Sequence, residues 1–334
     1  MVVGMKRATF IASLAVVLAA FAALVCAPAE ALAGAKRGLE VCAGVIVPAL
    51  SPFLIVSALL TGLGLPQLLA KAAGPFFARL FGVSGAAAAP FLLGLTGGYP
   101  VGAAAAAELC RRGELGGEEG TYILPFCNNT GPAFILGATG VGIFGSGRAG
   151  VLLYLSHILA AVAVGVLLSL GRPRGTARAA AAKMPIEARS LATVLPQSVK
   201  SAALSTLNIC GYVVFFSVIT GLLDALGVFT ASAAALAAHL GLELQFTRAL
   251  LTGLLELGSG VSAMRGLSLT PLNLALASFV LGFGGLSVHC QTLAAVDGTE
   301  IKTARHFAGR LLHGALSALF TFLAASALTA GGML

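Results

Sequence analysis

The sequence contains few charged residues and no tryptophan. Only 10% of its 334 residues are Asp, Glu, Lys or Arg, whereas 58% are hydrophobic. Soluble globular proteins have about 25% charged and 45–50% apolar residues, so this composition excludes an ordinary soluble domain. Without tryptophan, anchoring at the membrane–water interface has to rely on Tyr, Phe, Lys and Arg.

The sequence also lacks the cysteine spacing of a disulfide framework or a zinc site. Its six cysteines contain no CxxC pair and no Cys/His cluster, and we expect free, buried thiols. A GxGxxG match at 145–150 joins two apolar segments and does not follow a strand, so it predicts a tight turn. No nucleophile–base pair or cofactor motif is present in the sequence. We therefore expect neither an enzyme nor a bound cofactor or metal.

The apolar residues form membrane-length segments. A spanning helix needs about 20 such residues, and seven segments qualify: 8–28, 39–65, 120–145, 148–171, 203–227, 271–297 and 307–330. The first follows Lys6-Arg7 and precedes Ala31-Leu32-Ala33, which also resembles a signal peptide. We interpret residues 1–34 as an uncleaved first helix, with a cleaved signal-like segment as the alternative.

Two further apolar stretches are interrupted at their centres. The stretch 84–110 contains Gly97-Gly98-Tyr99-Pro100, and the stretch 246–270 contains Gly258-Ser259-Gly260. Half-segments of about 12 residues are too short to span a membrane. We expect two re-entrant helical hairpins, each of which enters and leaves on one side.

Similar features recur at a nearly constant offset. Pro52, Thr61, Thr96 and Phe126 correspond to Tyr212, Thr220, Thr252 and Phe283, at offsets of 156–160 residues. Each repeat contains an odd number of crossings, because hairpins do not cross, so the second copy is inverted. The predicted domains are residues 35–171 as the first repeat, 172–199 as a basic cytoplasmic linker and 200–334 as the second repeat.

The basic residues report this topology and not nucleic-acid binding, although the net charge is +8. With the N-terminus inside, fifteen of the 20 Lys and Arg residues lie on the cytoplasmic side and five outside. This bias follows the positive-inside rule and agrees with seven crossings. Arg310 is counted here among the cytoplasmic charges.

Polar residues interrupt two of the spanning segments. The first interruption is Phe126-Cys127-Asn128-Asn129-Thr130-Gly131-Pro132, and the second runs from Phe283 to Gln291. Non-helical backbone at membrane depth is tolerated only where it is buried or lines a wet cavity. Two such breaks in corresponding halves of one chain indicate the substrate site of a transporter.

These breaks and the hairpin tips supply the predicted substrate-binding residues, which are Gly98, Tyr99, Asn128, Asn129, Thr130, Glu256, Ser259, Ser287, His289 and Gln291. For the asparagines and Thr130, the alternative is that they only satisfy backbone groups freed by Pro132. For Glu256, an intramembrane carboxylate, the alternative is an ion pair with Arg248 or Arg265.

The site is expected to bind a small polar solute, plausibly an anion. Neither broken segment contains a lysine or arginine, and a helix N-terminus supplies only about half a charge. We therefore predict that a coupling proton on His289, or a cation near Glu256, contributes the missing positive charge.

The runs 94–102 and 126–132, with 207–212, 253–256 and 283–291, resemble the YlbJ-type sporulation integral membrane proteins of the nucleoside-recognition, or Gate, superfamily. The resemblance covers nearly the whole chain from about residue 39. It implies an all-helical fold similar to concentrative nucleoside transporters, with two hairpins and two broken helices around a central site.

The resemblance also implies a function in spore formation. The expected cargo is dipicolinate, carried across the outer forespore membrane of a spore-forming bacterium. Two alternatives stay open, a nucleoside or nucleobase transporter and a non-transporting sporulation assembly protein. The expected partners are a small-molecule substrate and the lipid bilayer, with a homo-oligomer left open.

Overall fold

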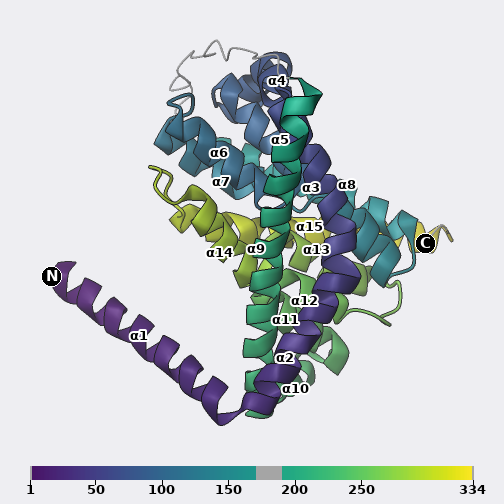
Figure 1. Cartoon of the computed structure of the whole chain (residues 1–334). Coiled ribbons are helices and arrows are strands. Elements are labelled where there is room, and N and C mark those ends of the chain that lie inside the picture. Colours follow the sequence, from purple (N-terminus) through teal and green to yellow (C-terminus); the bar gives the residue numbers. More distant parts are fainter. Residues whose placement is uncertain (1, 171–189, 333–334) are drawn as a thin grey trace.

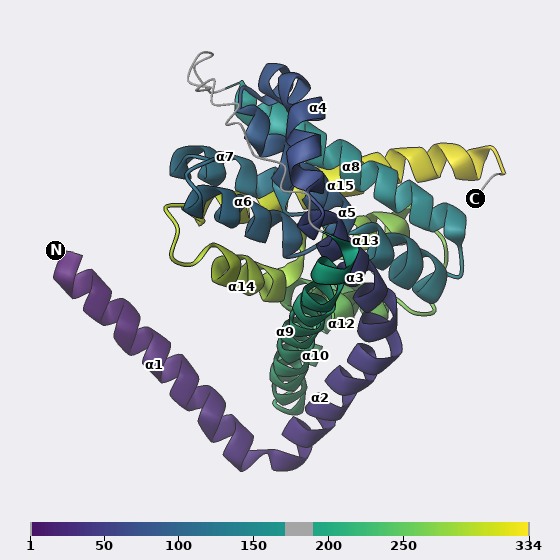
Figure 2. The ribbon, with the colours of Figure 1, turned by 45° about the horizontal axis from the view of Figure 1, so that its top comes forward.

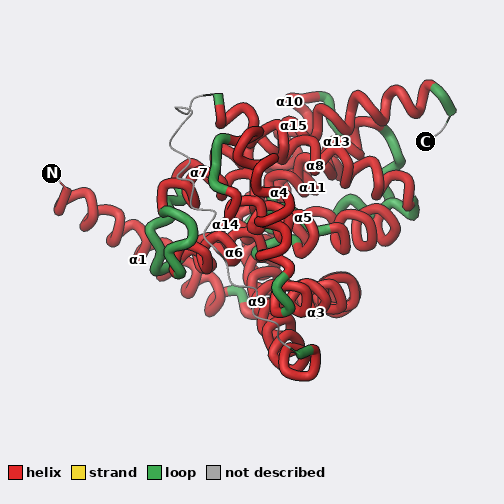
Figure 3. Tube along the Cα trace, turned by 90° about the horizontal axis from the view of Figure 1, so that it is seen from above, coloured by secondary structure: helices red, strands yellow, loops and turns green. Residues whose placement is uncertain are grey.

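The computed structural model describes residues 2–170 and 190–332, and in this part of the chain every regular element is a helix (Figures 1 and 3). Two of the elements, η1 and η3, are π-helical, and η2 is a short 3-10 turn. The elements are α1 (Val2–Cys26), α2 (Pro28–Val41), η1 (Cys42–Ile46), α3 (Val47–Gly62), α4 (Leu65–Phe81), η2 (Gly85–Ala87), α5 (Ala88–Gly97), α6 (Val101–Arg111), α7 (Gly117–Cys127), η3 (Ala133–Ile143), α8 (Gly147–Ser169), α9 (Leu191–Ala225), α10 (Val228–Leu240), α11 (Leu244–Leu255), α12 (Leu257–Ser262), α13 (Pro271–Phe283), α14 (Gly285–Val296) and α15 (Ala304–Ala330).

Two long rods run side by side through the molecule. One consists of α2, η1 and α3, which follow one another without a break, and the other is α9, with 35 residues (Figure 1). Gly34 and Gly38 lie against the backbone of Val218 and Val214, where an added Cβ would come within 2.8 Å. Small residues allow such close approach of apolar helices, which suits packing in lipid.

Helix α1 departs from the rest of the molecule. The chain bends by 101° between Phe10–Cys26 and Pro28–Ile46, and α1 projects away from the other helices (Figure 2). Pro28 begins α2 at the first helical position, where its missing N–H has no helical partner to lose. The large apolar side chains of α1 are exposed, including Phe10 at 66% and Phe21 at 64%.

Both re-entrant hairpins are formed. In the first, α5 and α6 pack together around a tip at Gly98-Tyr99-Pro100, with a cis Tyr99–Pro100 peptide. In the second, α11 ends at Leu255 and α12 begins at Leu257, so the tip is Glu256. Sequence analysis put this tip slightly later in the chain. The difference arises because the Glu256 carboxylate accepts hydrogen bonds from the first free N–H groups of α12 and starts that helix early.

Both interrupted segments are also present. The first is non-helical between Cys127 and Ala133, where α7 gives way to η3. The second is interrupted only at Gly284, whose φ of +89° is readily adopted by glycine alone. The two breaks therefore differ in length, because the first contains Pro132, whereas the second needs only two consecutive glycines with positive φ, Gly284 and Gly285.

Fewer elements reach membrane length than the seven segments of the sequence analysis. By length and composition, the described residues contain 4 helices able to cross a membrane, or up to 6 if each of two bent pairs is one span. The segment 120–145 falls outside this count, because α7 and η3 have only 11 residues each.

Two of the three predicted domain boundaries fall inside helices. The boundary after residue 34 lies within α2, and the linker that was expected to extend to residue 199 ends where α9 begins at Leu191. The charged residues of these segments indicated loops, but Ala-rich sequence continues the helices beyond their apolar parts, and the Ser190 side chain caps α9. Residues 172–189 of the linker lie outside the described residues.

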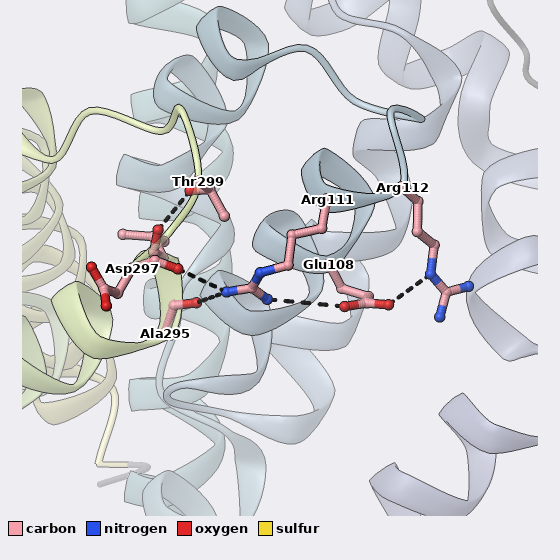
Figure 4. A network of polar contacts seen from close by, with 7 residues as sticks. Glu108, Arg111, Arg112, Ala295, Asp297 and Thr299 are labelled. Carbon is pink, nitrogen blue, oxygen red and sulfur yellow. Dashed lines mark hydrogen bonds and ion pairs between the residues drawn. The ribbon is translucent and has the colours of Figure 1, made fainter.

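A polar network fastens the first hairpin to the second broken helix (Figure 4). Arg111, the last residue of α6, donates to the carbonyls of Ala295 and Asp297 at 3.3 and 3.0 Å. These carbonyls lie at the C-terminal end of α14, where a cation is favourable. Glu108 pairs with Arg112 at 2.7 Å on the other side. Hairpin α5–α6 and helix α14 are therefore held together.

Glycine packing around the first break generates a stability prediction. An added Cβ on Gly94 or Gly102 would lie 1.8 or 2.0 Å from the Cys127 carbonyl oxygen. We expect Gly94→Ala to lower the stability of the purified protein by about 1–3 kcal/mol, because overpacking forces the backbone to shift. The measurement is thermal unfolding in detergent.

The matched control is Gly211→Ala in α9, where a Cβ would meet nothing within 4 Å. This variant should unfold at the wild-type temperature or slightly above it, because alanine favours the helix. Equal stability of the two variants would contradict the packing seen around Cys127.

Candidate functional site

A small cavity lies where the two hairpin tips and the two breaks meet. Its volume is about 50 Å³, and its polar lining includes Gly98, Tyr99, Thr130, Glu256 and Gln291. These five residues are half of the predicted substrate-binding set. Side chains of α3 and α9 form the apolar wall on the other side of what we call the central cavity.

Glu256 is buried and caps a helix. Its carboxylate oxygens accept hydrogen bonds from the backbone N–H groups of Gly258 at 2.9 Å and Ser259 at 2.5 Å. The Ser287 hydroxyl donates to it at 3.5 Å. Arg248, the alternative ion-pair partner, instead binds Asp224 at 2.7 Å. Within residues 2–170 and 190–332, no lysine or arginine forms an ion pair with this carboxylate, which lies in the cavity lining.

Asn128 and Asn129 do not line the central cavity, although both are fully buried. The Asn128 amide accepts from the Ala103 N–H at 3.3 Å and donates to the Thr292 hydroxyl at 2.8 Å. Asn129 donates to the Phe126 carbonyl at 2.8 Å. Both amides therefore bind backbone groups near helix ends, on α6 and α7, and neither binds the carbonyl that Pro132 would leave free.

Thr130 and Tyr99 connect the two breaks. The Thr130 hydroxyl donates to the Leu281 carbonyl at 2.8 Å, and the Tyr99 hydroxyl donates to the same oxygen at 3.3 Å. The Thr130 N–H donates to the His157 ring at 3.1 Å. The first hairpin, the first break and α13 thus share one set of hydrogen bonds beside the cavity.

Ser259 and His289 point to other neighbours. The Ser259 and Ser217 hydroxyls lie 3.2 Å apart, which ties the second hairpin to α9. The His289 ring packs 5.0 Å from Phe283 and 4.8 Å from Phe307, on the side of α15. His289 is not part of the cavity lining, and its assignment as the coupling group stays a prediction.

The principal residue of this region, Arg310 of α15, was not among the site residues predicted from the sequence. Its side chain is fully buried, and its guanidinium donates to Tyr99, Asn129, His313 and the backbone at both breaks. Arg310 had been counted as a cytoplasmic charge because it lies near the start of the last apolar segment. The available signal was an arginine inside that segment, since intramembrane charges mark functional sites.

Histidines complete the surroundings of Arg310. The Nδ1 atom of His313 lies 2.7 Å from the guanidinium and accepts a hydrogen bond from it. The Nε2 atom therefore carries the hydrogen and donates to the His157 carbonyl at 3.1 Å. This pattern requires a neutral His313, so the positive charge belongs to Arg310 alone.

A second, larger cavity adjoins the first. We call it the vestibule; its volume is about 400 Å³, and it lies between α3, the first hairpin and the N-terminal part of α9. Its polar lining includes Gln197, Ser201 and Ser205, spaced at one face of α9, and the Glu108–Arg112 pair. Leu54 lines both cavities.

Comparison with known proteins agrees with this architecture. No family model matches the chain. The fold is similar to that of CNTnw, a concentrative nucleoside transporter, in an outward-facing state, with a TM-score of 0.51 and 14% sequence identity. The alignment covers 97% of this chain and 86% of that chain. The protein is therefore an all-helical membrane protein with a concentrative-nucleoside-transporter-like fold.

A sequence relative is closer. The sporulation integral membrane protein YlbJ of Bacillus subtilis (strain 168) is 31% identical over 320 residues, which is 89% of this chain and 78% of YlbJ. Both likenesses are to membrane proteins, and neither indicates an enzymatic family. The chain belongs to the family of the sporulation integral membrane protein YlbJ.

Proposed function

We propose that this protein is a transporter of a small polar anion, and that it carries dipicolinate across the outer forespore membrane during spore formation. The family assignment and the transporter-like fold support this proposal. The observation that carries it is the central cavity, in which two hairpin tips and two broken helices meet. In membrane transporters such an arrangement binds the solute.

The vestibule supports transport by giving the cavity a polar approach. Helix α9 is long and apolar enough to span a membrane, yet Gln197, Ser201 and Ser205 line the vestibule. On the same helix, Leu204 and Leu207 are 56% and 67% exposed and do not line it. The polar side chains of this part of α9 therefore gather on the face that lines the vestibule, and the exposed leucines lie outside it. The vestibule is thus the route between one side of the membrane and the central cavity.

The cavity offers hydrogen-bond groups to a carboxylate. Gln291 is 7% exposed, and its amide has no hydrogen-bond partner among the residues that the structure describes. The hydroxyls of Tyr99 and Thr130 lie in the same lining, but both already donate to the Leu281 carbonyl, so the Gln291 amide is the donor available to a carboxylate. Sites for small molecules usually measure about 300–1,000 Å³, whereas the central cavity measures about 50 Å³. Solute binding therefore requires the hairpins to separate from α3 and α9.

A nucleoside transporter is the second candidate. The Glu256 carboxylate in the cavity lining favours it, because a carboxylate accepts hydrogen bonds from sugar hydroxyls and repels an anion. Uptake by proteoliposomes decides between the two candidates. Accumulation of radiolabelled dipicolinate and not of nucleosides supports the proposal, and the reverse result replaces it. Uptake of neither solute would favour a non-transporting assembly protein.

The Gln291 amide provides a mutational prediction. We expect Gln291→Ala to weaken dipicolinate binding more than tenfold, because a hydrogen bond to a charged group contributes about 1.5–3 kcal/mol. The measurement is the concentration dependence of uptake. Gln245→Ala is the control, since this exposed amide only binds the carbonyls of Ala263 and Arg265. Equal effects of the two substitutions would remove Gln291 from the binding site.

The vestibule provides another prediction, tested by cysteine labelling. In a background without accessible native cysteines, Ser201→Cys should react at least tenfold faster with a membrane-impermeant thiol reagent than Leu204→Cys. The two positions are neighbours on α9, but only Ser201 lines the vestibule. Reagent is added to each side of reconstituted vesicles in turn. Equal labelling at both positions, or none at Ser201→Cys from either side, would show that the vestibule is not an aqueous route.

A further inference from the structure

We infer that Arg310 is the positioning residue that sets the charge preference of the central cavity, and so makes it a site for anions. The inference deepens the proposed function, on which it rests. The residue itself does not line the cavity. It lies behind the residues that line the cavity, and it acts through its contacts with Tyr99 and with the ends of the broken helices.

Arg310 binds the C-terminal ends of both broken helices. It donates to the Pro125 carbonyl at 3.5 Å near the end of α7, and to the Gly282 carbonyl near the end of α13. Each helix C-terminus carries about half a negative charge. One guanidinium thus balances the two negative ends that meet at the centre. The N-terminal ends of η3 and α14, which start beside the cavity, keep their positive partial charges.

No carboxylate neutralises Arg310 within the described part of the chain. Its other partners are Tyr99, Asn129 and the neutral His313. The carboxylate of Glu256 is engaged by the N–H groups that begin α12, together with Ser287. The guanidinium is fully buried, so solvent and salt screen its field very little.

Tyr99 carries this influence to the cavity surface. Its ring lies 5.3 Å from the Arg310 guanidinium, and its hydroxyl accepts a hydrogen bond from it. The same hydroxyl donates to the Leu281 carbonyl, which fixes its direction. Tyr99 also lines the central cavity, as does Gln291, whose amide has no hydrogen-bond partner in the part of the chain that the structure describes. A carboxylate group that enters the cavity therefore meets oriented polar groups in the field of a buried cation.

The test measures the electrostatic potential of the cavity without any solute. Thr96 is exposed and lines the cavity, so Thr96→Cys is labelled in a background in which the four cysteines that are not buried are replaced by serine. The probes are an anionic and a cationic methanethiosulfonate of similar size. We expect Arg310→Gln to lower the ratio of anionic to cationic labelling rates at least tenfold.

Three further variants define the outcome. Arg310→Lys should keep the ratio within threefold, and so should Arg248→Gln, which removes a charge already paired with Asp224. Should Arg310→Gln not fold, Asn129→Asp sets a carboxylate against the intact guanidinium, 3.3 Å from the present amide oxygen, and should lower the ratio likewise. An unchanged ratio in the charge-neutralised protein, or an equal slowing of both probes, overturns the inference.

A second readout separates the inference from the proposed function. The protection of Thr96→Cys from labelling is measured with dipicolinate (pyridine-2,6-dicarboxylate) and with its uncharged analogue pyridine-2,6-dicarboxamide. Both compounds are tested with the wild-type residue at 310 and with Arg310→Gln. We expect the substitution to weaken protection by the dicarboxylate at least tenfold relative to the dicarboxamide. If neither compound protects the wild type, dipicolinate is not the solute and the proposed function fails, while the labelling ratios still decide the part played by Arg310.

Discussion

The structure depends on hydrogen-bond donors for the backbone carbonyl groups that have no helical partner at the ends of the two broken helices. An unsatisfied backbone group in the apolar core of a membrane costs several kcal/mol. Here Thr130 and Tyr99 donate to the Leu281 carbonyl, Asn129 donates to Phe126, and Arg310 reaches the ends of both helices. The broken geometry can exist only because these donors are present.

The same constraint explains the distribution of polar residues between the lining and its support. Asn128 and Asn129 are occupied with helix ends, whereas Gln291 lines the central cavity and its amide has no hydrogen-bond partner among the described residues. A polar side chain beside a break can therefore point toward a helix end and satisfy its backbone groups, or point into the cavity. In this protein, more of the buried polar side chains lie outside the lining of the central cavity than within it.

Much of the architecture could be predicted from the sequence, because breaks and tips carry local signals. Glycine and proline at 97–100 and 131–132 interrupt apolar runs, and the structure places a hairpin tip and a break there. The ends of α2 and α9 were misplaced, since charged residues in Ala-rich sequence indicate loops and helices equally well. Side-chain direction had no local signal at all. Asn128, His289 and Arg310 were assigned by position along the chain, and only the packing of α13, α14 and α15 decides what each contacts.

The hydrogen bonds between the two halves also set a condition on biosynthesis. The Asn128 amide pairs with Thr292, a residue 164 positions later in the chain. At about 5–20 residues per second, the ribosome needs roughly 8–33 s to deliver that partner. Until then the first half reaches the membrane with polar groups whose permanent partners have not been made. Water or the insertion machinery has to satisfy those groups in the meantime, and the first half cannot reach its final form as an independent unit.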